Sequence, residues 1–378
     1  MRKSLFGYGG TTKAIAKNFV NDGFWDIYDD KFSEISKDEF GNALLPVSEF
    51  DPAKSGLEIP SPGIPPHHEL IKKAKNLISE YDYFYEIYKA HLPFNIWISG
   101  TNGKTTTTSL IYHILREAGY NVELAGNIGR SMALRVAENE EKGDPDWFVL
   151  EISSFQLDNM YDFHAHIAVL LNITPDHLDR YGYVMQRYVD SKMRIIRNQT
   201  HEDYFIYWAD DEHVPNELAR REHPARQLPF ADRPRAGLAA YGRGEAGDDS
   251  YGFAKGSSLV VEQPRPFSIP LAQLSLPGKH NLRNCQAAAL ATLAAGVDQE
   301  TLARCLADFP GVEHRLERVG NFDGVQYIND SKATNVDACF VALDAQTQPT
   351  VLIVGGLDKG NDYSTLYDLV SRKCRALV

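Results

Sequence analysis

Residues 97–115 read WISGTNGKTTTTSLIYHIL, and this stretch constrains the fold more than any other part of the chain. An apolar run ends in a turn with two glycines and a lysine, and an amphipathic helix follows. A strand, a glycine turn and a helix N-terminus together direct backbone N–H groups and the positive end of a helix dipole at a bound anion. We therefore predict a phosphate-binding loop, in which Lys104 contacts the terminal phosphates and the Thr105 hydroxyl binds Mg²⁺.

The turn is a shortened variant of the eight-residue phosphate-loop motif, because Ile98 stands where that motif has its first glycine. A glycine turn that merely caps a surface helix is the alternative. The residues predicted to contact the phosphates of ATP are Gly100, Thr101, Asn102, Gly103, Lys104, Thr105 and Thr106.

Strands and helices alternate on both sides of this loop, which favours an α/β fold with parallel sheets. The chain has 378 residues, more than one hydrophobic core usually serves. We expect three domains, over residues 1–92, 93–311 and 312–378. In the first of them, a strand-helix-strand unit follows the N-terminus, and one helical stretch covers residues 67–90.

Two further apolar runs place polar residues at predicted strand ends. WFVLEI ends in Glu151, HIAVLLNI leads to His177, and Lys192 follows in the next helix. Taken singly, these would be a solvated acid, a structural histidine and a surface lysine. Because the carboxyl ends of parallel strands share one edge of a sheet, we expect all three near the phosphate loop, with Glu151 as a magnesium ligand.

Composition excludes several classes of protein. The formal net charge is −12, so the chain lacks the basic surface expected of a nucleic-acid or anionic-membrane partner. No run reaches the roughly 20 apolar residues of a membrane span, and no signal peptide opens the chain, so we expect a cytoplasmic protein. Four widely spaced cysteines predict reduced thiols rather than disulfides or zinc ligands.

Four segments, GTNGKTTT, LEISSFQL, NITPDHLDRYG and INDSKATN, together resemble the Mur ligases. The phosphate loop alone is shared with folylpolyglutamate synthases. SSFQL and NDSKATN single out the branch that adds D-glutamate to UDP-N-acetylmuramoyl-L-alanine. The resemblance implies an N-terminal Rossmann-like UDP-binding domain, a central P-loop ATPase-like domain with a parallel sheet, and a C-terminal Rossmann-like domain.

The reaction implied is amide formation in peptidoglycan precursor synthesis by a monomeric enzyme. ATP would phosphorylate the substrate carboxylate, and the amine of D-glutamate would then displace phosphate, giving ADP and phosphate. A carboxylate is a poor electrophile, and phosphoryl transfer depends mainly on positioning and charge neutralisation, which Lys104, Thr105 and two Mg²⁺ ions could supply.

By the same resemblance, Glu151 binds the first magnesium and His177 the second. Lys192 matches the family's N6-carboxylated lysine, whose added carboxylate turns a cation into an anionic metal ligand. The remaining matches on the nucleotide and amino-acid side are Asn281 near adenine, Arg315 and Asp330 near the γ-phosphate and ribose, and Lys332, Thr334 and Lys359 near D-glutamate and the transferring phosphate.

The UDP-substrate side is less regular in sequence. GYGGTT has a threonine where a dinucleotide fingerprint has its third glycine, which argues against NAD. The residues matched to the uridine, diphosphate and muramoyl-alanine contacts are Thr11, Thr12, Asp30, Lys31, Ser61, Gly63, Asn127 and Gln156.

The resemblance departs at the end of the chain, because the family's last domain normally continues well past Val378. That part carries a serine and a phenylalanine that hold D-glutamate. We therefore expect this chain to bind the UDP-substrate and to ligate poorly. Two alternatives stay open, namely a ligase of the same fold for another amino acid and a nucleotide-binding module without catalysis.

Overall fold

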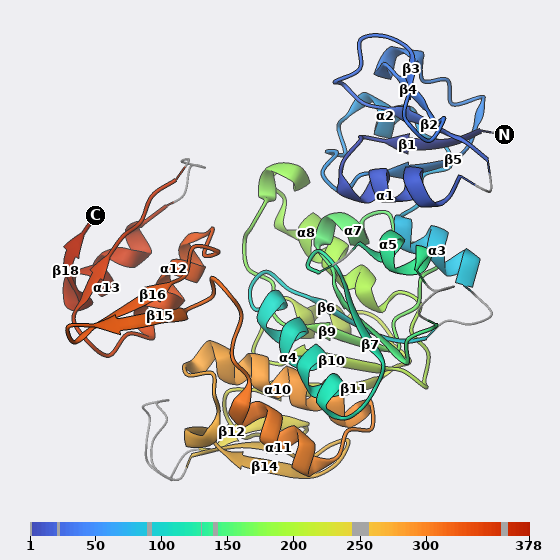
Figure 1. Ribbon diagram of the computed structural model, residues 1–378. Coiled ribbons are helices and arrows are strands. Elements are labelled where there is room, and N and C mark those ends of the chain that lie inside the picture. The colour runs from blue at the N-terminus through green and yellow to red at the C-terminus, as the bar shows by residue number, and fades with distance from the viewer. Residues whose placement is uncertain are drawn as a thin grey trace. The chain divides into compact units, whose positions relative to one another are not determined.

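A computed structural model describes residues 2–20, 23–88, 93–129, 131–138, 143–243, 257–356 and 362–378 (Figure 1). Its contacts form two compact units. The first unit comprises Met1–Lys104 and Leu115–Pro229, and the second comprises Thr105–Ile114 and Phe230–Val378. The three-domain division at residues 92 and 311 stays a prediction.

The first unit begins with a five-stranded sheet in the order β3-β4-β2-β1-β5. Strand β1 pairs in parallel with β2 and β5, and α1 connects β1 to β2 as the predicted strand-helix-strand unit requires. The elements here are β1 (Arg2–Phe6), α1 (Gly10–Asn18), β2 (Trp25–Tyr28), β3 (Ser36–Lys37), β4 (Ala43–Leu45), the 3₁₀ turn η1 (Val47–Glu49), β5 (Ser55–Pro60) and α2 (Glu69–Lys73).

The single helix predicted over residues 67–90 is wrong in part. Helix α2 ends at Lys73, and α3 begins at Glu80 and ends at Tyr88. Between them, the backbone N–H groups of Lys75 and Asn76 donate to the Glu58 carboxylate at 3.1 and 2.5 Å. A buried carboxylate therefore takes backbone donors that a continuous helix would have used internally.

A second sheet of the first unit contains five parallel strands in the order β10-β9-β6-β8-β7. Strands β6, β8 and β9 are buried at every position except Phe94, as expected for a parallel sheet covered on both faces, whereas β7 and β10 are half-buried at several positions. The α/β prediction is confirmed. The strands are β6 (Phe94–Ser99), β7 (Val122–Gly126), β8 (Trp147–Glu151), β9 (Ile167–Leu170) and β10 (Tyr204–Trp208). The helices between and after them are α4 (Lys104–Glu117), α5 (Met132–Ala137), α7 (Ser154–Leu157), η2 (Leu178–Tyr181), α8 (Met185–Met193), η3 (Arg194–Ile196) and α9 (Val214–Ala219).

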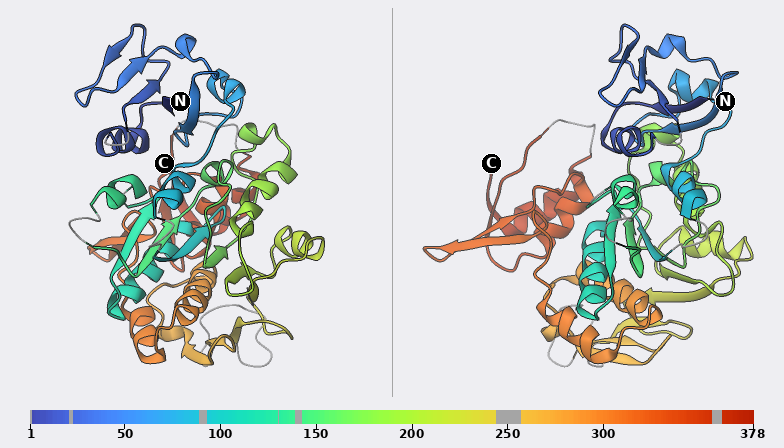
Figure 2. Two further views of the ribbon diagram at one scale, coloured as in Figure 1. Left: turned by 90° about the vertical axis from the view of Figure 1, so that its right-hand side faces the viewer. Right: turned by 45° about the vertical axis from the view of Figure 1, so that its right-hand side comes forward.

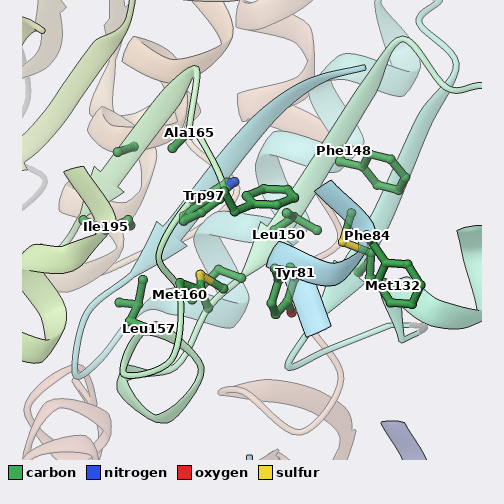
Figure 3. Close-up of a cluster of buried hydrophobic side chains, with 14 of the residues drawn as sticks. Tyr81, Phe84, Trp97, Met132, Phe148, Leu150, Leu157, Met160, Ala165 and Ile195 are labelled. Carbon is green, nitrogen blue, oxygen red and sulfur yellow. The ribbon is translucent and has the colours of Figure 1, made fainter. Parts of the chain in front are cut away.

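Aromatic side chains hold α3 against this parallel sheet. Figure 3 shows Tyr81 and Phe84 of α3 beside Leu150 of β8 and Trp97 of β6. The Tyr81 ring also meets Phe163 edge-on at a centroid distance of 5.8 Å, and the Trp97 ring lies 4.8 Å from the same phenylalanine. Buried aromatic pairs of this kind fix α3, and therefore Glu80 at its start, to the sheet that carries the phosphate loop.

The second unit contains an antiparallel arrangement of β12, β13 and β14 (Figure 1). Helix α10 packs against β12 and β13, and α11 packs against α10. Helix α10 is rich in alanine. It is buried along most of its length because small side chains allow close approach on every face. The bounds are β11 (Arg226–Ala231), β12 (Ala240–Arg243), β13 (Ser258–Val261), β14 (Phe267–Pro270), η4 (Leu271–Gln273), α10 (Lys279–Ala294) and α11 (Gln299–Asp308).

The described residues after 311 form two short strand pairs and two helices. Figure 2 shows β15 and β16 as a two-stranded ribbon, and among the described residues no third strand joins it. Strands β17 and β18 pair in parallel. The elements are β15 (Glu317–Phe322), β16 (Val325–Asn329), α12 (Val336–Asp344), β17 (Thr350–Leu352), η5 (Ser364–Leu366), α13 (Tyr367–Lys373) and β18 (Cys374–Leu377).

Candidate active site

The predicted phosphate loop lies between β6 and α4. Gly100 has φ +148° and Gly103 has φ +87°, conformations that side chains strongly disfavour. A Cβ on Gly100 would lie 3.0 Å from Leu171 Cβ and 3.3 Å from the backbone nitrogen of Asn172. The glycines therefore let the loop turn tightly against the end of β9. Thr105 and Thr106 follow in the first turn of α4 and are half-buried.

Two residues after β9 hold the loop in place, and the sequence analysis missed both. The side-chain amide of Asn172 accepts from Asn102 N and donates to Asn102 O, both at 2.9 Å. The Thr101 hydroxyl donates to Thr174 O and accepts from Thr174 N, both at 3.0 Å. These reciprocal pairs fix the loop backbone before any ligand arrives. The NIT segment marked their position, but only the fold places it beside the loop.

Two lysine ammonium groups converge on one carbonyl of the loop. Lys104 Nζ donates to Gly100 O and Thr101 O at 2.9 Å each, and Lys192 Nζ donates to Gly100 O at 2.9 Å. Lys192 is only 2% exposed and lies over the Tyr188 ring. Burial, together with the positive charge of Lys104, lowers the pKa of Lys192 well below its usual value.

Glu151 is the last residue of β8 and lies opposite Ile98 of β6 in the sheet. It is buried, and its Oε1 accepts from the Asn127 side-chain amide at 2.8 Å. Its Oε2 is also buried and has no hydrogen-bond partner among the described residues. A buried carboxylate oxygen without a donor favours a bound cation, so this residue fits the predicted magnesium role.

Gly126, directly before Asn127, explains how β7 and β8 approach so closely. It has φ +103°, and a Cβ there would lie 2.3 Å from the backbone oxygen of Glu151. A glycine is therefore required beside the candidate metal ligand, and the turn that follows directs Asn127 to the carboxylate.

His177 occupies a left-handed position, with φ 49°, at the start of η2. Its side chain is 56% exposed, its Nε2 lies 3.7 Å from Asp176 Oδ2, and its ring meets Phe155 edge-on. No hydrogen bond or ion pair among the described residues joins His177 to Glu151 or Lys192. Its predicted place in a metal shell therefore stays a prediction.

Gln156 has a local role that the motif did not reveal. Its Oε1 accepts from the backbone N–H and the hydroxyl of Ser153, both at 2.9 Å, which caps helix α7. Its Nε2 donates to the Tyr81 hydroxyl at 3.0 Å. The amide therefore connects α3 to the turn after Glu151, whereas its predicted contact to the muramoyl-alanine group stays a prediction.

In the first sheet, the glycine turn after β1 lies under Ser61. The Thr12 hydroxyl donates to Gly7 O at 2.7 Å and accepts from Gly9 N at 3.0 Å, which fixes the turn. A Cβ on Gly7 would lie 3.2 Å from Ser61 Cβ. The structure thus brings Thr12 and Ser61 to one turn, while a Cβ built on Gly63 meets nothing within 4 Å.

Thr11 and Asp30, two other residues predicted to contact the uridine diphosphate, have their partners outside this turn. Thr11 is a side-chain hydrogen-bond partner of Glu80, and Asp30 Oδ2 lies 3.1 Å from His68 Nε2 on the surface. The sequence analysis missed Asp29, whose carboxylate accepts from Tyr8 N at 2.6 Å and from Lys31 N at 3.0 Å. Asp29 therefore organises the loop in which the predicted Asp30 and Lys31 lie.

Three of the predicted nucleotide and amino-acid residues of the second unit, Arg315, Asp330 and Lys332, lie close together, whereas Asn281 lies apart from them in α10. Arg315 donates from Nη1 to Lys332 O at 2.9 Å, and Asp330 Oδ1 accepts from Leu316 N at 3.0 Å. Burial raises the pKa of Asp330. Asn281 is buried in α10, where its amide donates to Pro277 O at 2.8 Å.

Two other residues, Thr334 and Lys359, were also predicted to lie near D-glutamate. Thr334 is exposed just before the Asn335 cap of α12. Lys359 lies outside the described residues.

Comparison with known proteins finds a family match over the region that contains the phosphate loop, Glu151 and Lys192. Residues 98–292 match the family model of the Mur ligase middle domain. The chain is 48% identical over 324 residues to the UDP-N-acetylmuramoylalanine--D-glutamate ligase of Bacteroides thetaiotaomicron, an alignment covering 85% of this chain and 69% of that protein. A ligase of the same name from Salinibacter ruber is 41% identical over 330 residues, covering 84% of this chain and 68% of that protein.

Solved structures support the fold. The MurF ligase of Thermotoga maritima in complex with ADP has a TM-score of 0.59 at 16% identity, covering 100% of this chain and 86% of that one. None of the described helices is long and apolar enough to cross a membrane.

Proposed function

The chain belongs to the Mur ligase family, and from that premise we propose that it joins D-glutamate to UDP-N-acetylmuramoyl-L-alanine with ATP. Relatives that are 41–48% identical carry the name of that reaction, and this family includes a structure in complex with ADP. The proposed product is an amide, formed together with ADP and phosphate in peptidoglycan precursor synthesis.

One observation carries the proposal. The phosphate loop Gly100–Lys104 lies beside the end of β8, where Glu151 holds a buried carboxylate oxygen with no partner in the described chain. Loop N–H groups, the Lys104 ammonium and the start of α4 suit the phosphates of a nucleotide. A carboxylate oxygen without a hydrogen-bond partner at the same sheet edge suits the divalent cation that accompanies those phosphates. Together they form the two halves of an Mg²⁺-nucleotide site.

The residues fit magnesium only if Lys192 changes its charge. As an ammonium, Lys192 would repel a cation beside Gly100, whereas a carboxylated Lys192 would be an anionic oxygen ligand. Its low pKa favours the neutral amine, the form that can add CO₂. We propose that Thr105, Glu151, His177 and carboxylated Lys192 hold two Mg²⁺ ions. Bound there, magnesium would neutralise charge on the transferring phosphoryl group.

The chain's own groups would then position two successive reactions. An oxygen of the L-alanyl carboxylate attacks the γ-phosphorus of ATP, the bond to ADP breaks, and an acyl phosphate forms. Lys104 would stabilise the negative charge on the phosphate oxygens during this step. The amine of D-glutamate attacks the acyl carbon and loses a proton, and phosphate leaves as the amide forms. The residues proposed to hold the nucleotide and D-glutamate are Arg315, Asp330, Lys332, Thr334 and Lys359.

Substrate-side residues complete the proposal. Thr11, Thr12, Asp30, Lys31, Ser61 and Gly63 are proposed to bind the uridine diphosphate, and Asn127 and Gln156 the muramoyl-alanine group. Asn281 is proposed to lie near adenine. These assignments follow the family motifs, and the hydrogen bonds of Thr12, Asn127 and Gln156 explain how the positions are held.

A panel of amino acids tests the proposal against both alternatives. Phosphate release is measured from ATP with UDP-N-acetylmuramoyl-L-alanine, Mg²⁺ and each of D-glutamate, L-glutamate, L-lysine and meso-diaminopimelate. Release that depends on D-glutamate alone is the expected result. Release with a different amino acid would assign another substrate, and binding of ATP and UDP-substrate without any release would favour the non-catalytic module.

A further inference from the structure

A second cluster of metal-ligating side chains lies in the second unit, where α4 meets α11. His113 Nε2 is 3.2 Å from Asp308 Oδ1, and Cys305 lies one turn before Asp308 on α11. One ligand atom from each of the three residues lies within 4.8 Å of the other two. The sequence could not reveal this cluster, because His113 and Cys305 are far apart in the chain and no paired metal spacing occurs.

The donor set suits a borderline-soft divalent cation. A thiolate, an imidazole nitrogen and a carboxylate oxygen are all zinc ligands, with metal-ligand distances of about 2.0–2.3 Å. Ligand atoms in such a tetrahedral site lie roughly 3.5 Å apart. The His113–Asp308 pair already lies within that spacing at 3.2 Å, and because all three ligand atoms lie within 4.8 Å of one another, any contraction toward the thiol is at most about 1.3 Å. The His113 and Asp308 side chains are 26% and 50% exposed, which leaves them free to adjust, while Cys305 is held in the core.

The position on α11 adds a second physical reason. Asp308 is the last residue of a 10-residue helix, and Phe309 is its C-cap. The C-terminal end of a helix carries partial negative charge, so a cation there is favoured. Cys305 and Asp308 are three residues apart and therefore face the same side, toward His113 of the neighbouring helix.

We propose that His113, Cys305 and Asp308 form a Zn²⁺-type site, with water as the fourth ligand. The Cys305 thiol loses its proton on binding, so a sulfur-metal bond replaces the S–H bond. The His113–Asp308 pair now joins the helices directly, and Arg304 Nη1 lies 3.9 Å from Asp308 Oδ2 as a competing cation. Metal binding would connect α11 to α4, the helix that begins at Lys104. The site is distinct from the proposed Mg²⁺ residues.

Cobalt provides a direct test, because a Co²⁺-thiolate bond absorbs in the near ultraviolet and magnesium sites do not produce that band. Chelator-treated full chain in excess Mg²⁺ is titrated with Co²⁺ and then with Zn²⁺ in competition. We expect one equivalent of Co²⁺ to give the band and Zn²⁺ to remove it. Cys305→Ala should abolish the band, whereas Cys339→Ala, a matched thiol of the same unit, should keep it.

His113→Gln supplies a second variant should the buried Cys305→Ala protein fail to fold. Losing a ligand should weaken Zn²⁺ binding by at least about tenfold, since removing even a group that only supports a ligand costs about 10- to 100-fold. Absence of the band in the unaltered chain would overturn the proposal. So would a band that persists in Cys305→Ala, or a Zn²⁺ affinity that His113→Gln leaves unchanged.

Discussion

Glu80 gives the sharpest prediction for stability. It is 5% exposed at the start of α3, its Oε2 has no hydrogen-bond partner in the described chain, and burial raises its pKa to about 7. Its ordinary value is 4.5. Below pH 4.5 the carboxyl is protonated in both the folded and the unfolded state. Between pH 4.5 and 7 the unfolded state releases the proton first, so stability falls as pH rises.

Above pH 7 the full penalty applies. A difference from 4.5 to about 7, at about 1.36 kcal/mol for each pKa unit, corresponds to roughly 3 kcal/mol. Glu80→Gln keeps the shape and removes the ionisation. We therefore expect the variant to be more stable than the unaltered chain by up to about 3 kcal/mol at pH 8.5, and nearly equal to it at pH 4.

Urea denaturation followed by tryptophan fluorescence at the two pH values measures this difference. Glu69→Gln is the matched control, because that carboxylate is exposed and its pKa is lowered by Lys73. Equal unfolding free energies of Glu80→Gln and the unaltered chain at pH 8.5 would refute the reasoning, as would a gain of the same size at pH 4.

Three further changes test the site. Lys192→Ala should abolish phosphate release, and added short carboxylic acids should restore part of it by replacing the carboxylate of the carboxylated lysine. Full activity without added acids would contradict the proposed metal role of Lys192. Gly126→Ala should lower the free energy of unfolding in urea by about 1–3 kcal/mol, because at φ +103° the new Cβ would lie 2.3 Å from the backbone oxygen of Glu151. An unchanged urea midpoint would refute that clash. Tyr81→Phe removes the hydroxyl that accepts from Gln156 Nε2 and should lower the free energy of unfolding by about 1–3 kcal/mol in the same assay. No measurable loss would mean that this hydrogen bond does not stabilise the chain.

The strand-turn-helix of the phosphate loop was predictable because its signals are local. Glycines at positive φ, an apolar strand and a helix start all lie within a few residues of one another. The place of Glu151 at the end of a strand also followed from the apolar run before it. Local pattern and tertiary structure agree at these positions.

The support of the loop was not predictable, because it depends on contacts between distant segments. Asn172 and Thr174 meet the loop only after β9 has paired with β6. The break between α2 and α3 has the same origin, since a carboxylate from β5 draws the backbone of Lys75 and Asn76 away from the helix. Periodicity in residues 67–90 carries no information about Glu58.

If ATP activates the substrate carboxylate as an acyl phosphate, as we propose, one oxygen of that carboxylate must pass to the released phosphate. UDP-N-acetylmuramoyl-L-alanine labelled with ¹⁸O in its carboxylate is incubated with the chain, ATP, Mg²⁺ and D-glutamate, and the released phosphate is analysed by mass spectrometry. We expect one ¹⁸O atom in each released phosphate, because the carboxylate oxygen that attacks phosphorus leaves with it. Phosphate released without ¹⁸O would show that the reaction does not pass through an acyl phosphate.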